Sequence, residues 1–247
     1  MVTVHLKYDN LIPTIFKLSH TPEINRISSI IGGTKQKVAI ISSSINRQLS
    51  SRPDPYDAFR KNLVDLYDRM DNRYDQAAIH YGFVCSGCEE NCCRTKFHHH
   101  TYLECLYLKE GFDALSEENK HTIIYRARAV HDAHSIADRN GIVAREMCPL
   151  NVDSRCLLYS HRPMICRLHG IPHELNRPGQ TIQFHQGCND FHDAFNATDY
   201  YPFDRTPLYM QMAALEKRFK AESGINQKVK MTIAEMIMTY HETDRHR

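Results

Sequence analysis

Apolar residues recur at steps of three and four in five stretches of the chain, which is the spacing of one helix face. The longest stretch follows Asp54-Pro55, a good N-cap and a residue suited to the first helical position, and it precedes Gly82, a typical C-terminal cap. Its apolar stripe consists of Phe59, Leu63, Leu66, Met70, Tyr74, Ala77 and Tyr81. The pattern predicts a long amphipathic helix that delivers the chain to Cys85.

Four shorter stripes predict four more helices. Each is bounded by residues that typically start or stop helices, such as Ser or Thr at the beginning and Gly at the end. The expected helices fall within residues 103–111, 116–140, 204–224 and 232–240. The fold class is therefore expected to be mainly α. About five helices are expected around a loop-rich core in which cysteines bind a metal.

The N-terminal fifty residues differ from the rest of the chain. They show no sustained helical stripe and no cluster of metal-binding side chains, although residues 37–41 could form a short strand. We expect residues 1–50 to be a disordered N-terminal extension and residues 51–241 to form a cysteine-cluster metal-binding domain.

Four cysteines lie within nine residues directly after the first predicted helix: Cys85, Cys88, Cys92 and Cys93. Thiolates are soft ligands that favour zinc and iron–sulfur clusters. The side chains of the adjacent pair Cys92 and Cys93 are expected to diverge. One of the two would then serve a second metal, a second iron of a cluster, or the core.

A second, wider group consists of Cys148, Cys156, Cys166 and Cys188. Prolines and glycines cut this segment into loops, and little regular structure is expected in it. A metal anchored by these thiols would hold the segment together, because metal binding contributes directly to folding. The ninth cysteine, Cys105, lies among apolar residues of a predicted helix and is expected to be a buried core residue.

Both groups belong to a longer series of elements, which runs Cys85-x-x-Cys88-x-x-x-Cys92-Cys93, Cys148-Pro149-Leu150, Arg155-Cys156-Leu157-Leu158-Tyr159, Arg162-Pro163-Met164-Ile165-Cys166-Arg167 and Gly187-Cys188. This series resembles the YkgJ-type cysteine-cluster family, described as zinc- or iron-chelating domains. The resemblance covers roughly residues 54–240. It implies that the eight clustered cysteines bind metal, and it does not imply one settled reaction.

Charged and imidazole side chains accompany the cysteines. Arg162 and Arg167 stand beside Cys166 and are expected to be cofactor-binding residues, because cations offset the negative charge of thiolates. The alternative is a surface arginine paired with a carboxylate. Of the three histidines 98–100, one is expected near the metal, whereas His134 is expected to be a hydrogen-bonded core residue.

Charge and composition indicate which partners and which cellular compartment to expect. The formal net charge of +2 and a pI of about 8.1 are too balanced to favour nucleic-acid binding. No stretch reaches the roughly 18–20 apolar residues of a membrane helix, and no secretion signal opens the chain. We therefore expect a cytoplasmic protein, in a reducing compartment where cysteine clusters indicate metal sites, and we leave an unknown protein partner open.

Three functional classes remain open from the sequence. The first is a metal-chelating protein, as a redox or electron-transfer module; the second is a metal-dependent enzyme related to flagellin lysine methylases; the third is a zinc-stabilised interaction domain. No Rossmann fingerprint, P-loop or G-x-S-x-G motif supports a particular enzyme class. The uneven spacings and Cys148-Pro149 favour an iron–sulfur cluster, with 4Fe-4S as one form, slightly over zinc.

Overall fold

The computed structural model describes residues 55–85, 92–189, 191–192 and 199–244. All of these residues belong to one compact unit, which falls within Ile41–Arg247. The expected N-terminal extension, the strand at 37–41, the cap Asp54 and the ligand Cys88 lie outside the described residues.

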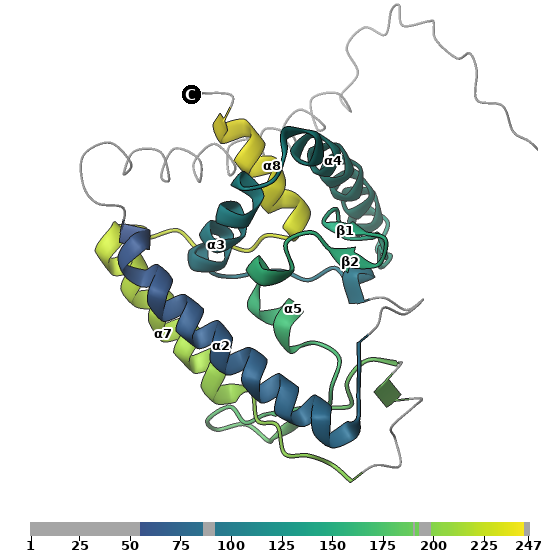
Figure 1. Cartoon of the computed structure of the whole chain (residues 1–247), viewed down its shortest axis with the longest axis vertical. Coiled ribbons are helices and arrows are strands. Elements are labelled where there is room, and N and C mark those ends of the chain that lie inside the picture. The colour runs from purple at the N-terminus through teal and green to yellow at the C-terminus, as the bar shows by residue number, and fades with distance from the viewer. Residues whose placement is uncertain (1–54, 86–91, 190, 193–198, 245–247) are drawn as a thin grey trace, which may run out of the picture. The chain divides into compact units, whose positions relative to one another are not determined.

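The described part of the chain is mainly helical, as the sequence predicts (Figure 1). Its α-helices are α2 (Pro55–Tyr81), α3 (Tyr102–Asp113), α4 (Glu117–Arg139), α5 (Met164–Leu168), α7 (Thr206–Ser223) and α8 (Ile233–Asp244). All five predicted helices are present, and α5 was not predicted. No helix among these residues is long and apolar enough to cross a membrane.

Several predicted helix ends are confirmed by their hydrogen bonds. Ser116 Oγ accepts from the Asn119 amide at the start of α4. At the start of α8, the Thr232 amide donates to Glu235 and the Glu235 amide donates to Thr232, which is a complete capping box. These contacts satisfy amides that no turn of the helix can reach.

Gly111 does not end α3, contrary to the sequence prediction, because the helix continues to Asp113. The glycine instead provides space for a neighbouring side chain. A Cβ atom at this position would lie 2.6 Å from the His161 ring, closer than real Cβ contacts allow. Gly111 thus lets His161 approach the backbone of α3.

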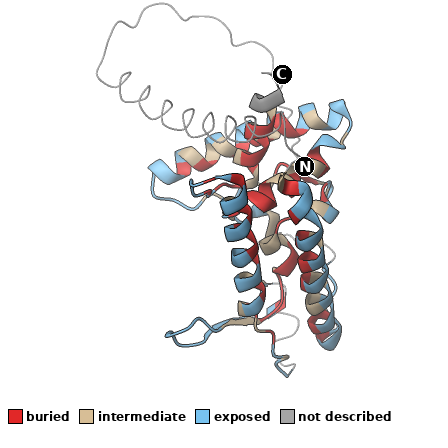
Figure 2. Ribbon diagram, turned by 90° about the vertical axis from the view of Figure 1, so that its left-hand side faces the viewer, coloured by how far each residue is buried: buried red, intermediate tan, exposed pale blue. Residues whose placement is uncertain are grey.

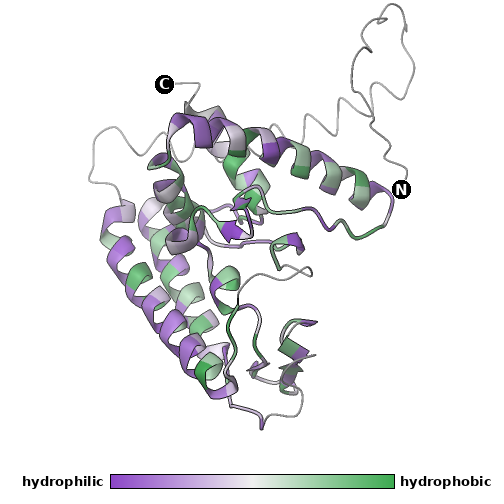
Figure 3. Ribbon diagram, turned by 45° about the vertical axis from the view of Figure 1, so that its right-hand side comes forward, coloured by the Kyte–Doolittle hydropathy of each residue, from purple (hydrophilic) through white to green (hydrophobic). Residues whose placement is uncertain are grey.

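The long helices α2 and α7 pack side by side in opposite directions. Phe59, near the start of α2, makes an edge-to-face contact with Phe219, near the end of α7, at 5.6 Å between ring centroids. A second helix pair, α4 with α8, packs elsewhere in the unit. Figure 2 shows the buried residues gathered on the facing sides of the helices, and Figure 3 shows hydrophilic and hydrophobic residues alternating around them.

Helix α3 connects the two helix pairs, because it contacts α2, α7 and α8. The buried carboxylate of Glu216, on α7, accepts from the amides of Tyr102 and Leu103 at the start of α3. At the other side, the Tyr240 hydroxyl of α8 donates to the carbonyl of Cys105. These bonds fix α3 as the central element of the fold.

Short elements occupy both cysteine-bearing segments, in which the sequence predicted no helix or strand. They are the 3-10 turns η1 (Cys92–Arg94) and η2 (Tyr159–His161), helix α5, and two antiparallel hairpins, β1 (Asn151–Val152) with β2 (Arg155–Cys156), and β3 (His173–Leu175) with β4 (Gln183–His185). Each is too short to produce a readable periodicity. Between residues 148 and 188 the regular structure is confined to elements of two to five residues, none of which was predicted individually.

Cys105 is buried in the core, as predicted. Cys105→Ala removes only one sulfur atom and keeps the backbone carbonyl that Tyr240 needs. We expect the variant to lose about 1–2 kcal/mol of unfolding free energy, measured by urea denaturation, and to keep the metal content of the wild type. Loss of metal from this variant would make Cys105 a ligand.

Candidate metal centre

A cavity of about 650 Å³ collects thiols from both cysteine groups. Six of the eight predicted ligands line it: Cys85, Cys92, Cys93, Cys148, Cys156 and Cys166. Cys188 is not among the lining residues, and Cys88 lies outside the described residues. The cavity surface is more apolar than polar, with Val130, Leu150 and Ile233 among its walls.

A backbone hydrogen bond joins the two groups directly. The amide of Cys148 donates to the carbonyl of Cys93 at 2.8 Å. The Asn151 side chain also hydrogen-bonds the Cys93 thiol, which lowers the pKa of that thiol. Residues 55 positions apart in the sequence are thus held together at the cavity.

The β1–β2 hairpin carries Cys156 back towards Cys148. Asn151 pairs with Cys156 across the hairpin, and the tight turn is made by Asp153 and Ser154, both with positive φ. Burial raises the pKa of the Cys148 and Cys156 thiols, and the amides of Leu150 and Leu158 oppose this by donating to the two sulfurs. In each case the donor lies two residues after the cysteine.

Cys92 and Cys93 do not diverge, contrary to the sequence prediction. The η1 turn brings their side chains into a hydrogen bond. This bond from the Cys92 thiol lowers the pKa of Cys93, because it stabilises the Cys93 thiolate, and it raises the pKa of Cys92. The assumption failed because a 3-10 turn brings consecutive side chains closer than an extended loop does.

Helix α5 places Cys166 in the same cavity. The amide of Met164, its first residue, donates to the buried carboxylate of Glu104 on α3 at 2.9 Å. Burial raises the pKa of Cys166 to about 12, and the charges of Cys156 and Cys93 add to this effect. The thiols therefore lie close enough to repel one another as thiolates, a repulsion that a bound cation would relieve.

Cys85 and Cys188 lie on the Tyr74 side of the site. Burial raises the pKa of the Tyr74 hydroxyl, and the charges of Cys85 and Cys188 add to it. The Cys188 amide donates to the carbonyl of Gly170 at 2.9 Å. This approach requires glycine at position 187, where φ is +92° and a Cβ atom would lie 2.6 Å from that carbonyl.

Both predicted cofactor-binding arginines line the cavity and also pair with Asp71 of α2. Arg167 is buried, and its guanidinium also donates to the carbonyls of Arg162 and Ser160. Arg162 lies 3.7 Å above the centre of the Tyr159 ring. The positive charge of Arg162 lowers the pKa of Cys156 and Cys166 against the larger effect of burial.

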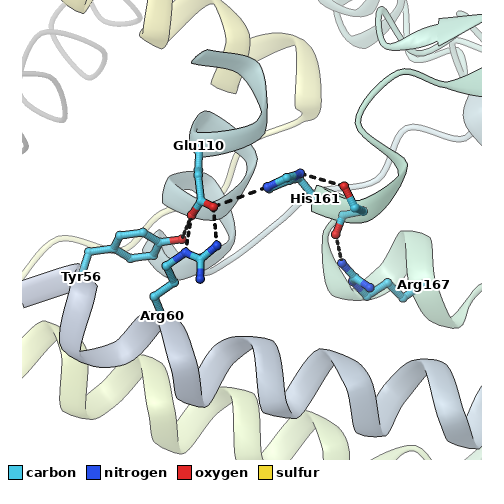
Figure 4. Close-up of polar contacts among 6 residues, drawn as sticks. Tyr56, Arg60, Glu110, His161 and Arg167 are labelled. Carbon is cyan, nitrogen blue, oxygen red and sulfur yellow. Dashed lines mark hydrogen bonds and ion pairs between the residues drawn. The ribbon is translucent and has the colours of Figure 1, made fainter. Parts of the chain in front are cut away.

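A polar network fixes η2, which lies between Cys156 and Cys166 (Figure 4). Glu110 of α3 accepts from Arg60 and Tyr56 of α2, and its Oε1 lies 3.6 Å from His161 Nε2. The carbonyl of the preceding residue, Ser160, accepts from Arg167. Arg167 is in this way connected, through η2, to helices α3 and α2.

Two residues that the sequence analysis assigned no site role hold this region in place. Glu104 binds the start of α5, and Arg205, which is almost fully buried, donates to the carbonyls of Leu168 and Ile171 on either side of Gly170. Glu104 lies in a predicted helix and Arg205 lies at the start of another. Only the tertiary structure shows that each reaches a cysteine-bearing loop.

Three histidines also line the cavity: His99, His134 and His169. His134 is buried as predicted, but neither of its ring nitrogens has a hydrogen-bond partner among the described residues, so the expectation of a hydrogen-bonded core residue was wrong. Burial lowers the pKa of His99 and His169 to about 4. These imidazoles are therefore neutral at pH 7, the form that binds metal.

Among the residues with described positions, no three His, Cys, Asp or Glu side chains converge closely enough to hold a metal ion as they stand. The donor set still fits a thiophilic metal. Most of the candidate ligands are thiols, and backbone amides donate hydrogen bonds to two of them, Cys148 and Cys156. The charge of Arg162 acts on Cys156 and Cys166. Binding of the metal would itself draw the thiols together, because metal binding is coupled to folding of the site.

No protein-family model, no curated protein and no solved structure matches the chain. The resemblance to the YkgJ-type proteins consequently rests on the cysteine motif alone.

Proposed function

We propose that this protein binds a metal centre through thiols of both cysteine groups, with an iron–sulfur cluster as the first candidate and zinc as the second. The observation that carries the proposal is the joining of the two groups at one cavity by the bond from the Cys148 amide to the Cys93 carbonyl. Two loops so far apart in sequence have no evident reason to present six thiols to one space other than metal binding.

The described residues suggest how the ligands divide. Cys93, Cys148, Cys156 and Cys166 affect one another's charge and form the first set. The second set is Cys85 and Cys188, both of which act on Tyr74, with Cys88 assigned by the motif. An iron–sulfur cluster would supply one-electron transfer and zinc would supply stability. The arginines beside the thiols would offset the negative charge in either case.

The deciding experiment is anaerobic purification of the full chain from a reducing cytoplasm, where the proposal places it. Iron, acid-labile sulfide and zinc are then quantified, and the visible spectrum is recorded. An iron–sulfur protein will be brown and contain iron and sulfide in near-equal amounts. A colourless protein with stoichiometric zinc would select zinc, and a protein without either metal would refute the proposal.

A metal-dependent enzyme is a second candidate, favoured by the size of the cavity. Its volume of about 650 Å³ lies within the range of roughly 300–1,000 Å³ for small-molecule sites, and its walls are largely apolar. The motif resemblance extends to flagellin lysine methylases. Incubation of the metal-loaded protein with flagellin and a methyl donor, followed by mass spectrometry, tests this candidate. If no methylated lysine is detected, the enzyme candidate is rejected and the metal-chelating role remains.

A further inference from the structure

The buried ring of His99 lines the cavity, and the hydrogen bonding of its two nitrogens indicates a role. His99 is 2% exposed, and its Nε2 has no partner among the described residues. Burying such a nitrogen without a partner costs free energy, because its hydrogen bond to water is lost and not replaced. A group that the protein binds would remove this cost.

The backbone of His99 is held rigidly. Its amide donates to the carbonyl of Met231 at 2.8 Å, and the Met231 amide donates back to the His99 carbonyl at 3.0 Å. The two neighbouring histidines differ, since His98 is only half-buried and His100 is exposed. Of the three consecutive histidines, only His99 lines the cavity.

A carboxylate faces the inner nitrogen of the same ring. Glu104 Oε1 lies 4.0 Å from His99 Nδ1, and both side chains are buried. Metal-binding histidines commonly direct one ring nitrogen to a carboxylate and the other to the metal. The same Glu104 oxygen accepts from the Met164 amide, two residues before Cys166, so the carboxylate beside the His99 ring also holds the start of the helix that carries Cys166.

We propose that His99 supplies a nitrogen ligand, through Nε2, to the metal bound by the thiols of this cavity. The centre is then a mixed sulfur–nitrogen site, and Glu104 orients the imidazole from behind. This inference rests on the proposed function, because it assigns a further ligand to the same centre. The other unpartnered imidazole is His134, on which the charges of Asp138 and Glu146 act without a hydrogen bond to either ring nitrogen among the described residues, and it serves as the comparison.

The test uses the full chain, purified anaerobically with the metal that it is found to carry. X-ray absorption at the edge of that metal reports whether imidazole scattering accompanies sulfur. We expect it in the wild type and in His98→Ala, His100→Ala and His134→Ala, and we expect its loss in His99→Ala. In competition with a chromophoric chelator, His99→Ala should retain metal at least about 10-fold more weakly, and Glu104→Gln about 10-fold.

Added imidazole separates a ligand role from a packing role. It should restore metal retention to His99→Ala, because the space left by the side chain can admit the free ring, and it should not affect the control variants. If His99→Ala does not fold, the wild-type spectrum and the His134→Ala spectrum still decide. All-sulfur coordination in the wild type, or loss of the imidazole signal in His134→Ala, would overturn the inference while leaving the metal centre intact. A wild type without metal would overturn both.

Discussion

Replacing Cys166 by serine should remove the metal and lower the unfolding free energy of the whole domain. The thiol belongs to a set of four whose charges act on one another, and thiolate sites can couple on the order of 10 kcal/mol of metal binding to folding. We expect metal content to fall from stoichiometric to near zero, and the unfolding free energy to fall by several kcal/mol. Elemental analysis and chemical denaturation measure the two effects.

Cys93→Ser is the matched variant from the first cysteine group. It keeps the Cys93 carbonyl that accepts from the Cys148 amide, so it removes a thiol without removing the backbone bond between the groups. The expected loss of metal and stability is the same as for Cys166→Ser, with Cys105→Ala as the unaffected control. Full metal content in one of the two variants, with loss only in the other, would mean that the groups form independent sites.

Replacing Arg167 by methionine should produce the largest loss of stability among the charged residues of the site. Its side chain is 5% exposed, and the change leaves two backbone carbonyls without their Arg167 donor and Asp71 with only the 3.4 Å contact to Arg162. Breaking a buried ion pair costs about 3–5 kcal/mol, and we expect about 3 kcal/mol because Asp71 is 33% exposed. Urea denaturation of the metal-free protein isolates this effect from ligation.

Arg60→Met is the control for that variant. Arg60 also pairs with a carboxylate, through two hydrogen bonds to Glu110, but its side chain is 44% exposed. Exposed pairs contribute about 0–1 kcal/mol, so this variant should stay close to the wild type. An equal loss in the two variants would show that burial does not set the contribution of Arg167.

The five long helices could be predicted from sequence because each has a complete apolar stripe and local end signals such as Ser116 and the Thr232–Glu235 box. Helix α5 could not, because its five residues are too few for a stripe and its start is stabilised by Glu104, sixty residues away in the chain. Gly111 was misread for the same reason: its role is set by His161, a distant neighbour.

The cysteine motif predicted six of the residues that line the cavity but not their arrangement. The sequence pattern does not indicate that Cys92 and Cys93 hydrogen-bond each other. It also does not indicate that Cys188 lies near Tyr74, while the other second-group thiols line the cavity. The same holds for His134, whose helical position indicates burial but not the absence of partners. The bond between Cys92 and Cys93 depends on the short η1 turn, and the other facts depend on contacts between residues that are far apart in sequence.

The bond between the Cys148 amide and the Cys93 carbonyl also affects the timing of assembly during translation. Cys148 follows Cys93 by 55 positions, and α3 and α4 must be made between them. At about 5–20 residues per second, the ribosome needs roughly 3–11 s to supply the second loop after the first has been synthesised. During that interval the newly made thiols of the first group have no partner loop, so the complete site can form only after the α4 helix has left the ribosome.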